Sequence, residues 1–379
     1  MYMIGDGKEG LEIILNEPGI RFETLWGSLQ DSLKIISSLE NKMYMLYQQK
    51  RDKAYLHLDL LNQVLAYYDP ATEYYRITLQ EFTGMQERFS QWIDSVVRSN
   101  STAMVSHYIK ADVKPIIAPG LTLAAQKQFF QEHWFDGVDW KDNTMISTDV
   151  LTNKITAYLG LYSNPGFRKP ELSQAFMAAV DKILPLAEQN PVIYDFTLRY
   201  LIRGFERFGF DDVILHIATN YSTPEQCEND QQSVTLARLE KYKLMAAGKT
   251  APDIRMNDFA GKEVRLSDIH SKKLIIFWAS WCLHCMQLLP QVISWSREGV
   301  DTDINVVPIS LDEDRNALEK TINELKIPWP VLVDYKKWSC QAAIDYNIYA
   351  TPTMLVLDKD NRIIAKPMNL GELRQVMGQ

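Results

Sequence analysis

Two cysteines separated by two residues are the feature of this sequence that most directly indicates chemistry. They lie in the run Trp281-Cys-Leu-His-Cys285. When such a segment is helical, one turn separates the cysteines and their sulfurs come within bonding reach. One sulfur can then attack a disulfide in another molecule, and the other can resolve the mixed disulfide that forms. The spacing therefore predicts thiol–disulfide exchange.

The elements around this motif favour a reactive thiol. An apolar run over residues 273–278 predicts a buried strand, and a helix is expected to begin at Cys282. A cysteine at a helix N-terminus lies near unpaired N–H groups and the positive end of the helix dipole, which favour the thiolate. His284 is in the first turn, where its ring could donate to the Cys282 sulfur and make the pair more oxidising. A solvated histidine without a partner is the alternative.

A second signature lies at Thr351-Pro352, directly before a predicted strand over residues 353–357. A proline that opens a strand after a tight turn is a place where cis peptide bonds occur, although an ordinary trans proline is equally compatible with the pattern. A cis proline beside the cysteines would leave the Thr351 backbone free to pair with an extended substrate peptide.

These two signatures together closely resemble the thioredoxin superfamily. The resemblance rests on residues 276–285, on Pro290 in the following helix, and on Ala350-Thr-Pro-Thr353. Residues 251–254 and 261–269 resemble its TlpA/ResA-like branch, which works in the bacterial cell envelope. The likeness covers residues 250–379. It implies a thioredoxin fold, Cys282 as nucleophile, Cys285 as resolving thiol and a cis Pro352, with Trp281 and His284 shaping the local field.

The sequence departs from this superfamily at two positions. Thioredoxins carry a buried Asp where this chain has Ile276, and TlpA-like reductants often carry a Glu where it has Leu288. Both groups handle the proton of the resolving thiol. Without them, deprotonating Cys285 depends on water, His284 or another group, so an oxidase or isomerase role gains ground over a reductant role.

The remaining motifs favour structural interpretations. Cys340 is expected to be a buried thiol, and Cys227, between acidic neighbours, to be unreactive; a disulfide between them is a minor alternative. Zinc would need two more ligands, and the sequence offers no second cysteine pair. A peroxiredoxin site is disfavoured because Ala279 stands where it needs Thr or Ser. The acidic run 312–314 is expected to be a solvated helix start.

The composition excludes several classes of protein. Of 379 residues, 46% are hydrophobic and 11% aromatic, enough to build the cores of more than one domain. A net charge of −8 argues against nucleic acid as a partner, because phosphates need a basic face. No apolar run approaches the roughly 18 residues of a membrane span.

The hydrophobic pattern divides the chain into three regions. Residues 1–26 alternate like strands and are expected to be the remnant of an upstream β domain. Residues 27–247 predict a mainly α domain, and residues 248–379 predict an α/β thioredoxin-like fold, with residues 248–252 as a linker. The predicted helices of the middle region cover residues 28–63, 72–98, 122–130, 150–161, 169–188, 192–208, 211–220 and 231–246. The last region predicts a helix over residues 337–346.

The helical region resembles a domain of unknown function that precedes TlpA-like modules in Gram-negative envelope proteins. Residues 130–139 and 153–159 carry this likeness. It implies a periplasmic or cell-envelope location, with any signal or anchor upstream of this chain. The expected partners are protein substrates with thiols or disulfides and a membrane or soluble redox partner. No cofactor beyond the Cys282–Cys285 disulfide is expected, and the oligomeric state is open. The alternative function is an envelope protein-binding module in which the redox domain is a switch.

Overall fold

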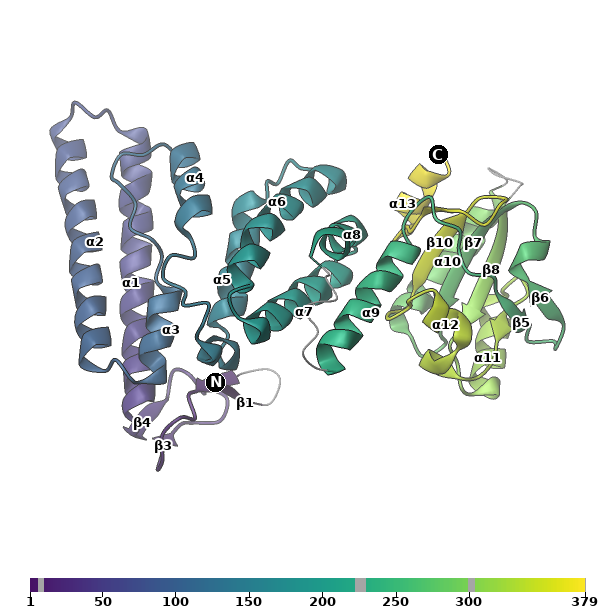
Figure 1. The fold of residues 1–379 in the computed structure, drawn as a ribbon, viewed down its shortest axis with the longest axis horizontal. Helices are drawn as coiled ribbons and strands as arrows, with labels where there is room; N and C mark the ends of the chain where they lie inside the picture. The colour runs from purple at the N-terminus through teal and green to yellow at the C-terminus, as the bar shows by residue number, and fades with distance from the viewer. Residues whose placement is uncertain (6–9, 222–229, 299–303, 379) are drawn as a thin grey trace. The chain divides into compact units, whose positions relative to one another are not determined.

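The computed structural model describes residues 1–5, 10–221, 230–298 and 304–378. The chain forms two compact units, residues 1–201 and residues 202–379. The first is mainly helical and the second contains an α/β sheet domain, so the predicted fold class is confirmed (Figure 1). Within the described ranges, no helix combines the length and the apolar character needed to cross a membrane.

The first unit begins with two small antiparallel sheets. β1 (Tyr2–Gly5) pairs with β2 (Gly10–Ile13), and β3 (Arg21–Glu23) pairs with β4 (Lys34–Ser37). The prediction of a helix from residue 28 was therefore wrong. Leu29 and Leu33 lie between β3 and β4 and pack with apolar residues of β2, and Ile36 lies in β4.

The first long helix begins where a side chain can cap it. Ser38 is the N-cap of α1 (Leu39–Tyr67), and its hydroxyl accepts from the Asn41 backbone N–H. The Asn41 side chain in turn pairs with both backbone groups of Ile14, which ties the helix to the chain that follows β2. These polar contacts, not the apolar period, set the start of the helix.

The remaining helices of this unit follow the predicted pattern closely. α1 and α2 (Glu73–Ser99) lie side by side in Figure 1. The predictions missed α3, because its nine residues give too short a pattern. The other helices are α3 (Met104–Asp112), α4 (Leu123–His133), α5 (Val150–Tyr162) and α6 (Lys169–Ala187), and α7 (Pro191–Arg207) begins in this unit and ends in the second.

A buried lysine in α5 makes the first unit sensitive to pH. Lys154 is 3% exposed, and its ammonium donates to the carbonyls of Val113 and Trp134 at 3.0 and 2.8 Å. Burial lowers the pKa of Lys154 from its ordinary 10.5 to about 8. Between those values the unfolded state binds more protons than the folded state, so stability rises with pH in this window.

We expect the free energy of unfolding to increase from pH 7.5 to 9.5 by about 2 kcal/mol more in the native chain than in Lys154→Met. Denaturant titration at the two pH values measures this difference. Equal increases in both proteins would show that Lys154 keeps an ordinary pKa when folded.

The second unit is built on a five-stranded sheet in the order β11-β10-β7-β8-β9. β7 (Lys272–Trp278) is its centre and is buried on both faces from Lys273 onward, as its continuous apolar run predicted. β8 (Ile304–Ser310) runs parallel to β7, and β9 (Leu332–Val333) runs parallel to β8. β10 (Thr353–Leu357) runs antiparallel to β7, and β11 (Ile363–Ala365) antiparallel to β10.

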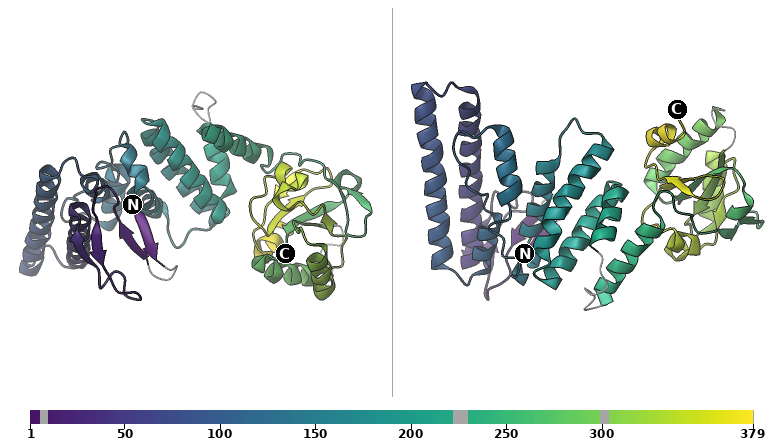
Figure 2. Two further views of the ribbon diagram at one scale, coloured as in Figure 1. Left: turned by 90° about the horizontal axis from the view of Figure 1, so that it is seen from below. Right: turned by 45° about the horizontal axis from the view of Figure 1, so that its top comes forward.

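Helices pack around this sheet (Figures 1 and 2). One predicted helix, residues 337–346, is divided: a 3-10 turn covers Lys337–Ser339 and α12 follows at Gln341–Asp345. The positive φ of Lys337 is incompatible with a continuous helix start there. The other elements are α8 (Asp211–Asn220), α9 (Asp230–Leu244), β5 (Arg255–Asn257), β6 (Glu263–Arg265), α10 (Leu283–Arg297), α11 (Arg315–Leu325) and α13 (Leu370–Val376).

Both outer strands of the sheet have further backbone partners. Beside β11, Gly248 N–H donates to the Ile363 carbonyl, and Ile363 N–H donates to the Lys249 carbonyl, each at 2.8 Å. Beside β9, the Phe259 N–H donates to the Val331 carbonyl at 2.8 Å. Residues 248–252, predicted as a linker, therefore contribute to the sheet edge instead.

The two compact units divide within α7, between residues 201 and 202. The predicted end of the helical domain at residue 247 stays a prediction. Side-chain contacts connect α9 with the sheet domain. Met245, at the end of the α9 region, is 1% exposed and packs in the core of the sheet domain. Lys241 donates from α9 to the Ile344 carbonyl of α12 at 3.0 Å.

Candidate functional site

The sheet register brings the cysteine motif and the Thr351-Pro352 loop together. The motif follows the last residue of β7, and the loop precedes the first residue of β10. β7 and β10 are antiparallel neighbours in which Phe277 lies opposite Thr353, so both segments lie at the same sheet edge. The Thr351–Pro352 peptide bond is cis, as the resemblance implied.

Cys282 is held between a helix end and a backbone carbonyl. It is the N-cap of α10, and its sulfur accepts from the Cys285 backbone N–H at 3.3 Å. Its thiol donates to the Thr351 carbonyl at 3.2 Å. The side chain is 8% exposed, so the sulfur lies just below the surface. The Cys285 N–H therefore suits a thiolate at Cys282, whereas the Thr351 carbonyl suits a protonated thiol.

Cys285 lies one turn further along α10 and is fully buried. Both cysteines are free thiols. Burial, followed by the hydrogen bond to Cys282 and the charge there, raises the pKa of Cys285 to about 12. Cys285 therefore keeps its proton at neutral pH while Cys282 faces the loop.

Exposed apolar side chains surround Cys282. Trp281 is 51% exposed and Leu283 is 70% exposed. The Trp281 ring meets Trp338 edge to face, with centroids 6.2 Å apart, and the Lys337 ammonium lies 5.7 Å from the Trp281 ring. A surface of this kind suits a partner that offers its own apolar side chains.

His284 points to solvent in the first turn of α10. In the described part of the chain its ring has no hydrogen bond to the Cys282 sulfur. The predicted influence of His284 on the thiol stays a prediction.

The two positions that lack the superfamily's carboxylates are apolar and buried. Ile276 is fully buried in β7, and Leu288 is 8% exposed in α10. Both belong to the hydrophobic core of the sheet domain.

Asp312 is a buried carboxylate beside the cysteine motif, and the prediction that it is solvated was wrong. It is 1% exposed and follows β8. It accepts from the Ser280 N–H at 3.0 Å, from the Ser280 hydroxyl, and from the Ser310 hydroxyl at 2.7 Å. Glu313 and Asp314 are exposed, as expected, and Asp314 is the N-cap of α11.

The sequence contains a pattern from which the burial of Asp312 could have been predicted. Strands β7 and β8 are parallel, so their carboxyl ends share one edge, and Ser310-Leu-Asp312 ends β8 where Ala279-Ser280 ends β7. Polar residues at the carboxyl edge of a parallel sheet lie where α/β proteins build their sites. The charge of the run 312–314 obscured this signal.

Of the two other cysteines, Cys340 is among the residues that the structure describes and Cys227 is not. Cys340 is a free thiol and fully buried, as predicted, and burial raises its pKa. Cys227 lies outside the described residues, so its predicted inertness and its pairing with Cys340 stay predictions.

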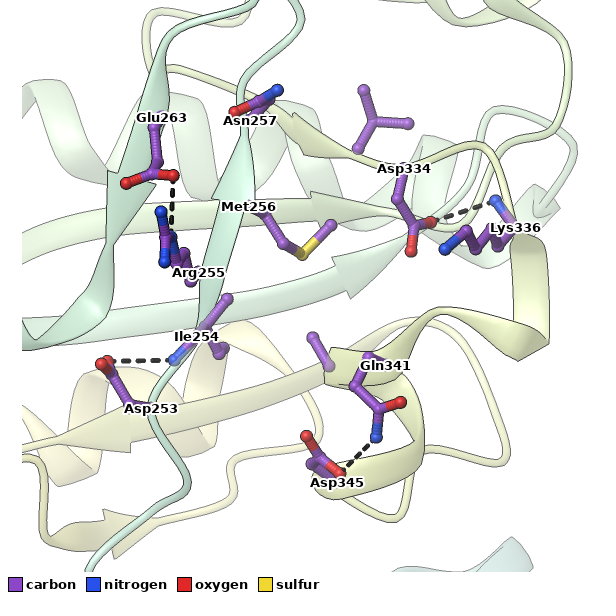
Figure 3. Close-up of a pocket in the computed structure, with 12 residues that line it drawn as sticks. Asp253, Ile254, Arg255, Met256, Asn257, Glu263, Asp334, Lys336, Gln341 and Asp345 are labelled. Atoms are coloured by element: carbon purple, nitrogen blue, oxygen red, sulfur yellow. Dashed lines mark hydrogen bonds and ion pairs between the residues drawn. The ribbon is translucent and has the colours of Figure 1, made fainter.

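A pocket of about 520 Å³ lies elsewhere on the sheet domain (Figure 3). None of the site residues predicted from the sequence lines it. Several of its charged groups have local partners: Arg255 pairs with Glu263 at 2.7 Å, and Asp345 accepts from Gln341 at 2.7 Å.

The fold and the paired cysteines define a thioredoxin-like domain at the C-terminal end of the chain. Residues 247–366 match the AhpC/TSA family. This match covers most of the sheet domain.

More specific similarity is found with proteins named thiol-disulfide oxidoreductase ResA. The protein from Bacillus cereus is 24% identical over 123 residues, which are 32% of this chain and 69% of the relative. The protein from Geobacillus kaustophilus is 27% identical over 124 residues, which are 31% of this chain and 67% of the relative. This chain is therefore similar to ResA proteins over about a third of its length.

Solved structures give matches of the same kind. A thiol-disulfide oxidoreductase from Bacteroides fragilis has 25% identity and a TM-score of 0.33, covering 34% of this chain and 98% of the other. A thioredoxin-like protein from Bacteroides caccae has 17% identity and a TM-score of 0.48, covering 70% of this chain and 97% of the other.

Proposed function

We propose that this chain is a thiol–disulfide oxidoreductase that exchanges disulfides with protein substrates through Cys282 and Cys285. The observation that carries the proposal is the position of Cys282, which accepts from the Cys285 N–H at a helix start and faces the Thr351 carbonyl beside a cis proline. The names of the ResA relatives support the same reaction class.

In the reducing direction, the first step forms a mixed disulfide between Cys282 and the substrate. Its thiolate attacks one sulfur of a substrate disulfide, the substrate S–S bond breaks, and the other substrate sulfur leaves as a thiolate. The N–H of Cys285 and the N-terminus of α10 stabilise the negative charge that Cys282 carries before attack.

In the second step Cys285 releases the substrate. Its sulfur attacks the Cys282 sulfur, the mixed disulfide breaks, and a Cys282–Cys285 disulfide forms. The substrate leaves with both sulfurs reduced, and the thiolate that was freed in the first step takes its proton from water. The departing substrate thiolate takes up the proton of Cys285, because the buried carboxylates of other thioredoxins are absent at Ile276 and Leu288. Forming the mixed disulfide also removes the charge on Cys282 that helps raise the pKa of Cys285.

A thiol partner, membrane-bound or soluble, supplies or accepts the two electrons, and no cofactor takes part besides the cysteine pair. The exposed side chains Trp281, Leu283 and Trp338 offer an apolar contact surface for a protein substrate. We place this reaction in the cell envelope, on the likeness to TlpA/ResA-like proteins. Direct convergence of two thiols and a cis-proline loop favours catalysis over the alternative of a partner-binding switch.

Equilibration of the full chain with glutathione buffers tests the proposal. We expect a two-electron transition, in which a tenfold change in the thiol–disulfide ratio corresponds to about 30 mV. Thiol trapping measures the fraction reduced, and Cys282→Ser is expected to remove the transition together with all exchange of insulin disulfides.

The midpoint of this transition gives the direction of electron flow. A potential near about −120 mV would make the protein a disulfide donor, and one at or below about −250 mV would make it a reductant. Both outcomes support oxidoreductase activity. A native chain without a transition, or a Cys282→Ser variant that still exchanges disulfides, would contradict it.

A further inference from the structure

The helix that precedes the sheet domain contacts the loop that faces Cys282. In α9, the Arg238 guanidinium carbon lies 5.0 Å from the ring centroid of Tyr349. The rings of Tyr242 and Tyr349 are 6.4 Å apart and inclined at 45°. Since Tyr349 is two residues before Thr351, these contacts are made to the start of the cis-proline loop.

A buried carboxylate fixes the two α9 side chains. Glu206 accepts from the Tyr242 hydroxyl at 2.8 Å and pairs with Arg238 at 2.7 Å. The side chain of Glu206 is 6% exposed and that of Arg238 is 33% exposed. A buried carboxylate that loses its partners is strongly unfavourable, so Glu206 restricts both side chains to one arrangement.

Further contacts keep α9 in place against the sheet domain. The Lys366 ammonium, just after β11, lies 5.7 Å from the Tyr242 ring and pairs with Asp211 of α8 at 2.9 Å. The chain directly after α9 continues as the partner of β11 through Gly248 and Lys249. Both side-chain contacts and the backbone pairing after its C-terminal end therefore hold α9 against the sheet domain.

Building on the proposed function, we propose that Glu206, Arg238 and Tyr242 are positioning residues for thiol–disulfide exchange. They hold Tyr349, and through it they fix the Thr351 carbonyl against the Cys282 sulfur. All three precede residue 247, where the similarity to the AhpC/TSA family begins. The region before the redox domain therefore contributes to the reactivity of Cys282.

The expected effect follows from the contact between Cys282 and Thr351. The carbonyl accepts from the thiol at 3.2 Å and offers nothing to the thiolate. If the loop loosens, the thiol loses this acceptor, and the sulfur reacts faster with an alkylating agent. The Thr351 backbone also loses its fixed position for an extended substrate, so KM for a protein disulfide rises.

Arg238→Gln and Tyr242→Phe in the full chain test the proposal. We expect each variant to raise the rate of Cys282 alkylation by iodoacetamide at pH 7 by about threefold or more, and to raise KM for insulin more than it lowers kcat. Mass spectrometry of the Cys282 peptide assigns the alkylated residue.

Two control variants match these substitutions in the first unit. Arg199 pairs with Asp195 at 2.7 Å with side-chain exposures of 35% and 9%, which makes Arg199→Gln equivalent to Arg238→Gln in burial. Tyr158 is 1% exposed and donates to the Gln131 carbonyl at 2.7 Å, so Tyr158→Phe matches Tyr242→Phe. Both controls are expected to leave the alkylation rate unchanged even where they lower Tm.

An unchanged alkylation rate in Arg238→Gln or in Tyr242→Phe would overturn the proposal, whatever the change in Tm. So would an equal increase in the controls. Alkylation reports on Cys282 whether or not insulin is reduced. Failure of the positioning role is therefore distinguishable from failure of the proposed activity, which the Cys282→Ser variant tests.

Discussion

Replacing Cys285 by serine is expected to arrest exchange at the mixed disulfide and to lower turnover of insulin by about a hundredfold or more. Cys282 keeps its helix-start position and its contact with Thr351, so attack still occurs. The hydroxyl that replaces the Cys285 thiol cannot displace the substrate sulfur. Non-reducing electrophoresis with a disulfide-containing substrate is expected to show a covalent adduct that dithiothreitol removes.

Cys340→Ala is the control for this experiment. Cys340 is also a fully buried thiol of the sheet domain, so its loss tests whether removal of a buried sulfur alone causes the adduct. We expect normal turnover and no accumulated adduct. An adduct that persists in Cys285→Ser/Cys282→Ser would assign the attack to another cysteine and contradict the mechanism.

Asp312→Asn is expected to destabilise the sheet domain by about 2–3 kcal/mol and to lower its Tm by roughly 5–10 °C. The carboxylate accepts from Ser280 and Ser310, whereas an amide directs one N–H₂ group at donors that then lose their acceptor. Ser280 is two residues before Cys282, so the alkylation rate of Cys282 is expected to change as well. Thermal unfolding and alkylation kinetics measure the two effects.

Asp314→Asn is the matched control for this substitution. Asp314 lies two residues away and caps α11 by accepting from the N–H groups of Asn316 and Ala317. Asparagine is as good an N-cap as aspartate, so a change of only a few tenths of a kcal/mol is expected. If both variants lose equal stability, the buried contacts of Asp312 with Ser280 do not support the motif.

Most of the fold could be predicted because the elements are long or fully buried. The apolar run of β7 and the repeated spacing of α2 and α6 each had only one satisfactory interpretation. Predictions failed where short-range polar contacts decide. The start of α1 depends on Ser38 and Asn41, and the break before α12 depends on the backbone conformation of Lys337.

The site could be predicted only as far as local motifs reach. Residue type and spacing identify Cys282, Cys285 and Pro352 in the sequence, and the sheet register brings them together. The sequence does not identify Asp312 and Arg238 in this way. Their contacts join residues that are 32 or more positions apart, and hydrophobic periodicity does not predict such contacts. A charged run in sequence can be solvated or buried, and only the packing distinguishes the two.

The covered edges of the sheet affect how copies of this protein meet one another. An unpaired outer strand is a template on which another chain can add as a further strand, which leads to aggregation. Here residues 248–251 occupy the edge beside β11, and residues 258–259 occupy part of the edge beside β9. Under the proposed function, a protein substrate with an exposed strand would find both outer strands of the sheet already partnered. We expect such a strand to pair with the cis-proline loop beside Cys282 and not to extend the sheet.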